Sequence, residues 1–236
     1  MKKEKYLKMF IEDCKYYDLE NIEAKTILNN INFKGKLVLD IGAGIGNLSF
    51  PLSKYAKKVI ALDKDWRLGK YYIYHNKKNL KFINQSAERY IKDKKFDVIL
   101  LAWPTLDYKL INLIKKSMHK DSLFVFITCS DKSDYETVID KIESSRDFNK
   151  DMQNKKKFIN ILPKKFKVIL NKKITTSYCF PNEAIAFRVI KNSMNLWFNT
   201  KFDKEKEKKL KDIISRHTKD KKIIFEEKIY FYILRK

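Results

Sequence analysis

The sequence predicts an α/β protein built on a doubly wound, mostly parallel sheet of seven strands. Three observations lead to this prediction. From residue 36 onward, short apolar runs alternate with helix-length segments, which is typical of parallel βαβ units. Three of the five glycines fall within five positions directly after the first of these runs. The 236 residues, of which 44% are hydrophobic, suffice for the core of one α/β domain.

Two helices are expected before the sheet, over 5–17 and 21–28, where apolar residues recur every three or four positions. Helices 182–198 and 203–217, capped by Asn182 and Asp203, form an insertion before the last strand. Apolar runs predict strands at 37–41, 58–62, 81–84, 96–102, 122–128, 166–178 and 223–234. The connecting helices are expected at 46–56, 65–76, 106–118 and 133–146.

The net charge indicates which kinds of binding partner the protein can attract. The chain has 52 Lys and Arg residues and 29 Asp and Glu residues, a formal net charge of +23, and such a surplus attracts polyanions. Most of the cations are lysine, and Asn and Ile are also abundant, a bias that an AT-rich coding sequence would produce. The densest basic block is 150–173, and the lysine-rich stretch between the helix at 133–146 and the strand at 166–178 is interpreted as an exposed loop. Two interpretations stay open, a surface for nucleic acid or a nucleotide-like substrate, and a solvated basic surface.

Several classes of protein are not expected. The longest apolar runs, 98–103 and 123–127, have the length of strands and not of membrane spans. The basic N-terminus is followed by an amphipathic pattern and not by an apolar core, so a cytoplasmic protein is expected. Three widely spaced cysteines argue against a disulfide framework or a zinc knuckle, and no two of the three histidines stand at ligand spacing. No metal site is therefore expected.

The glycine cluster is the most informative feature. Gly42, Gly44 and Gly46 follow Asp40, which belongs to the first predicted strand, and Asp63 directly follows the second. The carboxyl ends of parallel strands meet at one edge of a sheet, so the two acids are expected close together. A turn without side chains lets backbone N–H groups approach a ligand. The pattern predicts that both carboxylates and the loop converge on one small molecule.

Segments 38–47 and 59–63 resemble the first two motifs of class I S-adenosylmethionine-dependent methyltransferases, in the spacing of the two acids and in the pattern D-x-G-x-G-x-G. Segments 84–88 and 96–101 resemble the adenine-contacting segment and the fourth strand of that family. The resemblance covers about 25–130, and more loosely the last strand, and implies a Rossmann-like fold. It implies one methyltransferase domain with N-terminal cap helices at 1–34, a cofactor-binding core at 35–130, a variable lid or insertion at 131–222 and the last strand at 223–236.

The resemblance implies S-adenosylmethionine as the cofactor. Gly42 and Gly44 would let the backbone approach its methionine moiety, and Asp40 would help to hold the ammonium group, directly or through water. Asp63 would accept hydrogen bonds from both ribose hydroxyls, and Ser86, where the family often has Asp, would border the adenine. The residues that the resemblance implies for the cofactor are Asp40, Gly42, Ala43, Gly44, Gly46, Asp63, Lys64, Ser86, Ala87 and Ala102.

Two alternatives for the glycine loop are weighed. One is a tight strand-to-helix turn without a ligand. The other is a dinucleotide-binding unit, whose fingerprint is G-x-G-x-x-G. Here the last glycine comes one position early, and the charge of Asp40 would lie where a pyrophosphate binds. A sulfonium cofactor that carries an ammonium group suits that charge better, which favours S-adenosylmethionine.

The acceptor is expected at the end of the fourth strand. Enzymes that methylate exocyclic amines often carry D/N-P-P-Y/F/W there, but Ala102 and Trp103 replace the first two members and only Pro104 remains. The candidate substrate residues are Trp103, Pro104 and Tyr108, since either aromatic ring can stack on a planar acceptor. Methyl transfer is an in-line displacement that depends mostly on positioning, so no catalytic base is assigned.

Two hypotheses of different classes follow. The first is an active methyltransferase with a small-molecule or RNA acceptor. The alternative is a non-catalytic methyltransferase-like protein that binds nucleic acid through its basic surface. The intact acids and glycine loop favour the enzyme, because a binding module would not need the cofactor acids. The sequence does not predict an oligomeric state.

Overall fold

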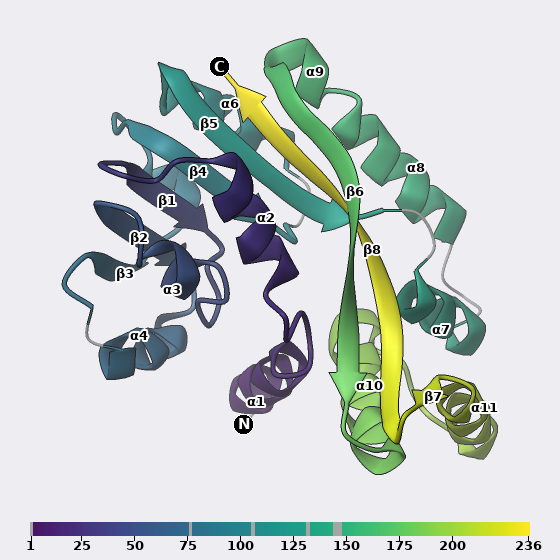
Figure 1. The fold of residues 1–236 in the computed structure, drawn as a ribbon. Coiled ribbons are helices and arrows are strands. Elements are labelled where there is room, and N and C mark those ends of the chain that lie inside the picture. The colour runs from purple at the N-terminus through teal and green to yellow at the C-terminus, as the bar shows by residue number, and fades with distance from the viewer. Residues whose placement is uncertain (1, 76, 105–106, 131–132, 144–147) are drawn as a thin grey trace. The chain divides into compact units, whose positions relative to one another are not determined.

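The computed structural model describes residues 2–75, 77–104, 107–130, 133–143 and 148–236. It confirms the predicted α/β class with a mostly parallel sheet (Figure 1). The strand order is β3-β2-β1-β4-β5-β8-β6, and the two-residue strand β7 (Thr218–Lys219) pairs with β8. Seven strands therefore form the path of the sheet, as predicted, and β7 makes it eight-stranded.

The parallel half of the sheet carries the glycine loop. Its strands are β1 (Leu37–Ile41), β2 (Lys58–Asp63), β3 (Leu80–Asn84), β4 (Phe96–Ala102) and β5 (Met118–Cys129). β1 pairs in parallel with β2 on one side and with β4 on the other. The chain thus winds outward in both directions from β1, and the carboxyl ends of β1 and β4 form the switch point where ligands bind in open α/β sheets.

The last two long strands extend the sheet beyond β5. β8 (Lys222–Arg235) is antiparallel to β5, with Val125 opposite Ile233. β6 (Lys167–Phe180) lies next to β8 and forms the edge. The apolar run near the C-terminus thus forms a buried strand, as its aromatic and branched residues predict.

The contacts divide the chain into two compact units. The sheet unit comprises Glu23–Cys129, Met152–Ile174 and Ile229–Lys236, and the helical unit comprises Met1–Ile22, Ser130–Asp151 and Thr175–Lys228. The boundaries cut β6 after residue 174 and β8 after residue 228, so both strands run from one unit into the other. The predicted division into four segments stays a prediction.

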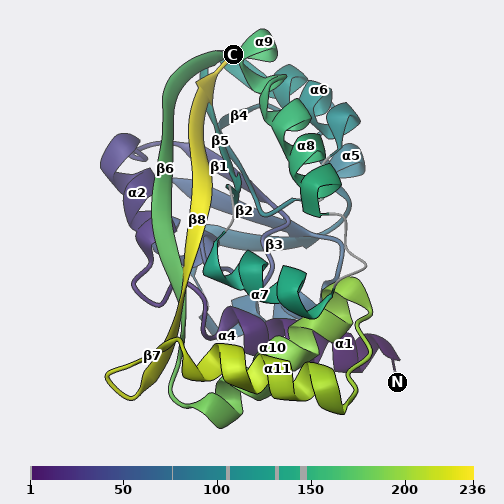
Figure 2. The ribbon, with the colours of Figure 1, turned by 90° about the vertical axis from the view of Figure 1, so that its right-hand side faces the viewer.

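The sheet unit has helices on both faces of its sheet (Figure 2). α2 (Ile22–Asn30) and α3 (Ser49–Leu52) bury Ile27 and Leu52 against one face. The other face is covered by α5 (Ala87–Tyr90), α6 (Tyr108–Lys116), α8 (Phe148–Ile159) and α9 (Leu162–Lys165). Because both faces are covered, β1 and β4 read as continuous apolar runs and not as alternating ones.

The helical unit has its own core. α1 (Lys2–Cys14), α7 (Asp134–Ile142), α10 (Glu183–Phe198) and α11 (Lys204–Ser215) belong to it. Its fully buried side chains include Phe180, Ile190 and Leu210. The predicted caps are confirmed, since the Asn182 side chain accepts from the Ile185 N–H at 2.9 Å and that of Asp203 from the Lys206 N–H at 2.8 Å. The predicted helical insertion before the last strand is therefore present.

Two sequence predictions were wrong. The lysine-rich stretch before the predicted strand at 166–178 is not a loop, because α8 and α9 occupy it. Phe158, Leu162 and Phe166 are spaced four residues apart and are all buried, while lysine is itself a good helix former. The helix expected over 46–56 is only α3, because Pro51, in the middle of that range, has no N–H to donate. The side-chain amide of Asn79 donates to the carbonyls of Ser53 and Ala56 in the turn that follows α3.

The structure also bears on the cysteines, on membrane spans and on metal ligands. The three cysteines are free thiols, and burial raises the pKa of Cys14. Across the residues that the structure describes, every helix is too short or too polar to span a bilayer. A search of the same residues finds no group of three His, Cys, Asp or Glu side chains able to hold a metal ion.

The helical unit contains a buried carboxyl group on α1. Asp13 accepts a hydrogen bond from Ser193 at 2.6 Å and a longer one from the Tyr178 hydroxyl at 3.4 Å. Burial raises the pKa of Asp13 to about 6, and the hydrogen bonds from Ser193 and Tyr178 oppose that rise. In the unfolded chain the same group titrates near pH 4.

This difference predicts a pH-dependent cost of folding. Between about pH 4 and pH 6 the unfolded chain loses the Asp13 proton first, so the folded state loses stability as the pH rises. Asp13→Asn removes this titration, and its free energy of unfolding should rise relative to the parent by about 3 kcal/mol across that range. Urea unfolding at several pH values measures it, with the exposed Asp212→Asn as control. A difference between variant and parent that does not change with pH would contradict this account.

Candidate functional site

The candidate site lies at the carboxyl ends of β1, β2 and β4, within the sheet unit. Asp40 pairs with Ala61 of β2 and Leu100 of β4 in register, and Ile41 pairs with Leu62 and Leu101. The chain leaves β1 directly into the glycine loop, residues 42–46. The structure therefore brings the predicted loop and the ends of its two neighbouring strands to one edge of the sheet.

The glycine loop needs the conformational freedom of glycine. The φ angles of Gly42, Gly44 and Gly46 are +72°, +55° and +95°, a region that other residues enter only with strain. The N–H groups of Gly42 and Ala43 both donate to the carbonyl of Leu62, at 2.8 and 3.1 Å. These two hydrogen bonds fix the loop against the end of β2. The space beside the Gly42 Cα is open, since a Cβ added there would meet no atom within 4 Å.

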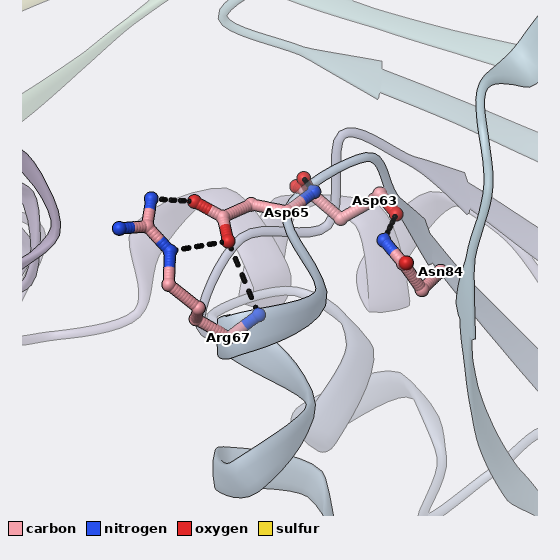
Figure 3. Close-up of polar contacts among 4 residues, drawn as sticks. All are labelled: Asp63, Asp65, Arg67 and Asn84. Atoms are coloured by element: carbon pink, nitrogen blue, oxygen red, sulfur yellow. Dashed lines mark hydrogen bonds and ion pairs between the residues drawn. The ribbon is translucent and has the colours of Figure 1, made fainter. Parts of the chain in front are cut away.

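Asp63 holds the same loop from β2. Its Oδ2 accepts the Gly44 N–H at 3.1 Å and its Oδ1 accepts the Asp65 N–H at 2.9 Å. A carboxylate has about four acceptor positions, so these two bonds leave room for two more donors on a half-exposed side chain. The Asp63 carbonyl accepts from the side-chain amide of Asn84 at 3.1 Å (Figure 3).

The turn after β2 is ordered by its own ion pair. Asp65 caps the short helix η1 (Trp66–Leu68) by accepting from the Arg67 N–H at 3.1 Å, and the Arg67 guanidinium binds the same carboxylate (Figure 3). Lys64 is exposed between the two acids. The turn thus points the Asp63 carboxylate at the glycine loop while Asp65 is occupied by Arg67.

Asp40 is buried beneath the loop. It is 3% exposed, and its Oδ2 accepts from the Ser49 hydroxyl at 2.6 Å. Burial raises the pKa of Asp40 to about 6, the Ser49 hydrogen bond lowers it, and the charge of Asp63 raises it. The Tyr72 hydroxyl donates to the carbonyls of Ala43 and Gly44, each at 3.3 Å. Tyr72 therefore holds the loop itself, whereas Asp40 binds Ser49 at the start of α3, the helix that follows the loop.

The segment expected at the adenine follows β3. Asp63 stands opposite Asn84 in the β2–β3 register, and the Gln85 N–H donates to the Asp63 carbonyl at 3.0 Å. Ser86 is the residue before α5 but makes no side-chain capping bond. Ser86 and Ala87, both half-buried, are thus connected through Gln85 to the carboxylate residue that faces the loop.

The end of β4 presents Trp103. Ala102 is the last paired residue of β4, opposite Ile127 of β5. Trp103 then takes a φ of +54°, while its N–H still donates to the Ile127 carbonyl at 2.9 Å. Its indole N–H donates to a carboxylate oxygen of Glu23 at 2.9 Å. Glu23 is 4% exposed in the first turn of α2, so a buried carboxylate orients an indole that is 40% exposed.

Glu23 is a site residue that the sequence did not indicate. It lies 80 positions before its partner, and a single carboxylate in a helix's first turn is usually read as a favourable dipole interaction. The other candidate substrate residues are placed differently. Pro104 is half-buried, and the ring of Tyr108, at the start of α6, packs against Phe158 of α8 with centroids 5.2 Å apart.

The comparisons with known proteins identify the family. The family model described as ribosomal RNA adenine dimethylase matches residues 2–195, most of the chain. The chain belongs to the ribosomal RNA adenine dimethylase family. This is a family of S-adenosylmethionine-dependent methyltransferases, and the predicted resemblance is confirmed. The match contains the glycine loop, Asp63, Trp103 and Glu23.

One curated relative matches part of the chain, and several solved structures share its fold. "Probable ribosomal RNA small subunit methyltransferase A" of Methanosphaera stadtmanae is 41% identical over 64 residues, which are 26% of this chain and 24% of the relative. The aligned segment thus spans about a quarter of that protein. The YcgJ protein of Bacillus subtilis is 15% identical with a TM-score of 0.58, over 90% of this chain and 97% of the other.

A second structure gives the same result for the fold. A proposed methyltransferase from Bacillus halodurans has a TM-score of 0.59 at 14% identity and covers 91% of this chain, with 97% of its own length aligned. At such identities the likeness shows the fold alone. It confirms the predicted Rossmann-like methyltransferase fold.

The loop geometry predicts different costs for two glycine substitutions. A Cβ on Gly46 would lie 2.4 Å from Cε2 of Phe50, whereas a Cβ on Gly42 would lie in open space. The Phe50 ring cannot easily move, because it packs against Tyr72 and His75 with centroids 5.0 and 4.0 Å apart. Gly42→Ala should cost about 1–2 kcal/mol of unfolding free energy through its positive φ. Gly46→Ala should cost about 1–3 kcal/mol more. Urea unfolding measures both, and equal losses would contradict the packing argument.

Proposed function

We propose that the protein is an S-adenosylmethionine-dependent methyltransferase that acts on RNA. One observation carries the proposal. A glycine loop and the carboxylate of Asp63 are joined at the switch point of the sheet, in a chain of the ribosomal RNA adenine dimethylase family. Membership of that family favours RNA over the small-molecule acceptor that the sequence also allowed.

The residues present fit the cofactor. Gly42 is exposed and the space beside its Cα is open, so the main chain can approach a ligand closely there. The two unused acceptor positions of Asp63 match the two hydroxyls of a ribose. Ser86 and Ala87 follow the strand next to Asp63 and would border the adenine. The other expected cofactor residues, Ala43, Gly46, Lys64 and Ala102, lie in or beside the same loops.

Asp40 has a different role in this proposal. Its carboxylate is buried and accepts the Ser49 hydroxyl, so it would act on the ammonium group of the methionine moiety through its electric field. A buried negative charge beneath the loop favours a positive ligand above it. The same charge would oppose a pyrophosphate, which argues against the dinucleotide alternative.

The cofactor, when bound, supplies a methyl group on a positively charged sulfur. The protein has to hold an acceptor atom in line with that methyl group and to exclude water, and positioning of this kind supplies most of the rate. The end of β4 is the place for the acceptor, because β4 is the neighbour of β1 on the side away from the ribose-binding acid. Ala102 offers no polar side-chain atom, so polar contacts to the acceptor would come from main-chain carbonyls.

The first test concerns cofactor affinity. Asp63→Ala removes the acceptors for two hydroxyls, and S-adenosylmethionine should bind more weakly by about 2–3 kcal/mol, measured by titration calorimetry. Asp121→Asn, an exposed acid distant in sequence, should bind like the parent. No measurable binding by the parent protein would reject the enzyme and leave the non-catalytic alternative.

A matched pair of glycines sharpens this test. Gly35 and Gly42 have φ angles of +77° and +72°, and a Cβ would meet nothing within 4 Å at either. The backbone strain of Gly35→Ala and Gly42→Ala should therefore be alike. Only the Gly42 methyl group would project toward the proposed cofactor, so only that variant should lose affinity. Equal affinities for both variants would place the cofactor elsewhere.

The second test concerns the acceptor. We propose that Trp103 stacks on a planar base and that Glu23 holds its indole in place. Trp103→Leu keeps apolar bulk but loses the flat ring, so kcat/KM for RNA should fall about tenfold while cofactor affinity stays unchanged. Glu23→Gln keeps an acceptor oxygen for the indole N–H and should retain activity, whereas Glu23→Leu should not. An unchanged kcat/KM in Trp103→Leu would exclude Trp103 from the acceptor site.

A further inference from the structure

A second surface of the sheet unit carries exposed aromatic side chains. η1 and α4 (Gly69–His75) follow the β2 turn directly. Trp66, Ile73 and Tyr74 are 72%, 76% and 87% exposed, the three highest values among the exposed large hydrophobic residues of the described chain. Together with the exposed Lys70 they are spaced by three and four residues, so they share one side of this helical segment. We call Trp66, Lys70, Ile73 and Tyr74 the α4 face.

The residues of the α4 face are exposed although the helix itself is well packed. On the opposite side of the same segment, Leu68 and Tyr72 are 3% and 7% exposed. The Tyr72 ring packs against Phe50 and Phe82, with centroids 5.0 and 4.9 Å apart. The helix is thus anchored by one apolar side and presents a second one to solvent. Large apolar side chains gathered on a surface usually mark an interaction site.

The charge around the α4 face is positive. Residues 66–87 contain Lys70, three further lysines and no Asp or Glu, while the charge of Arg67 is paired with Asp65. Residues 41–62 also lack acids and add three lysines. Lys77 donates to the Phe50 carbonyl and the Ser53 hydroxyl, at 3.4 and 3.2 Å, so these two basic segments are in contact. The exposed Tyr55 lies between Lys54 and Lys57 in the segment 41–62.

From these observations we infer that the α4 face binds an unpaired segment of RNA. Flat aromatic rings stack on unpaired bases, and lysines placed among them neutralise the phosphates of the same strand. Trp66 and Tyr74 would provide the stacking surfaces, and Lys70 with its basic neighbours would provide the charge. A protein partner would gain little from so many cations without acids. An amphipathic membrane helix would need a longer apolar side than that of the seven-residue α4.

The α4 face lies close to the position proposed for the methyl acceptor. This part of the inference rests on the proposed function, in which the acceptor is RNA. Trp66 comes three residues after Asp63 at the end of β2, while Trp103 follows β4. β2 and β4 flank β1, and adjacent strands lie about 4.8 Å apart, so the two strand ends are separated by about 10 Å. A strand of RNA that contacts both places would extend from the acceptor position past the cofactor.

The experiment measures RNA binding without cofactor. The probe is a fluorescein-labelled single-stranded RNA of about 12 nucleotides, with the duplex of the same sequence as comparison, followed by fluorescence anisotropy. Trp66→Ala and Tyr74→Ala should each raise the dissociation constant about tenfold. Lys70→Ala should reduce the slope of log affinity against log salt by about one. The duplex should bind more weakly than the single strand.

Matched controls come from the helical unit. Trp197→Ala removes an aromatic ring that is 48% exposed on α10, and Lys208→Ala removes an exposed lysine on α11. Both should bind the RNA like the parent protein. Because Trp66, Lys70 and Tyr74 are exposed, their variants should have the same midpoint of thermal unfolding as the parent. Circular dichroism measures that midpoint.

The outcomes separate this inference from the proposed function. Parent-like binding by the Trp66→Ala, Tyr74→Ala double variant, or an equal loss in the controls, would overturn the inference. Binding to vesicles of phosphatidylcholine and phosphatidylserine in place of RNA would overturn it too, in favour of a membrane surface. S-adenosylmethionine binding by the parent protein is measured separately, so a failure to bind the cofactor would reject the enzyme without changing the RNA result.

Discussion

The arrangement of the site depends on one residue, Asp63. Its carboxylate accepts main-chain N–H groups from the glycine loop and from its own turn, and its carbonyl accepts from the segment after β3. Three connections that follow three different strands are thereby held to one another. A carboxylate suits this position because it accepts several hydrogen bonds at once and donates none. In the proposed function, the same property would let it hold a ribose without giving up the loop.

The contacts around Asp63 explain why much of the site was predictable from sequence. The positive φ angles of Gly42, Gly44 and Gly46 require glycine, and Asp63, at the end of the neighbouring parallel strand, accepts the Gly44 N–H. Local patterns such as the caps Asn182 and Asp203 were predictable for the same reason, since each bond reaches only three residues along the chain. Features that depend on residues close together in the sequence can therefore be predicted from the sequence alone.

The features that were missed depend on distant partners. The Glu23 carboxylate meets the Trp103 indole across 80 positions, and no local pattern distinguishes it from an ordinary helix-start acid. The side-chain amide of Asn79 binds the carbonyls of Ser53 and Ala56 in the turn after α3, 26 and 23 positions away. α8 was mistaken for a loop because the lysines dominate its composition, although Phe158 and Leu162 are buried at helical spacing. The contacts of Glu23 and Asn79 are distant in sequence, whereas α8 agrees with the local helix preference of lysine.

The origin of the net charge can be argued from where the cations lie. A compositional bias toward lysine acts along the whole sequence, and α11 shows its effect: its lysines alternate with Glu205, Glu207 and Asp212 on a solvated helix. Such a bias does not remove acids from 66–87, nor does it place Trp66 and Tyr74 in solvent beside them. Exposure of large rings is opposed by the hydrophobic effect, so it needs a compensating role. Stacking on the bases of a polyanion is a role that uses both the rings and the surrounding charge.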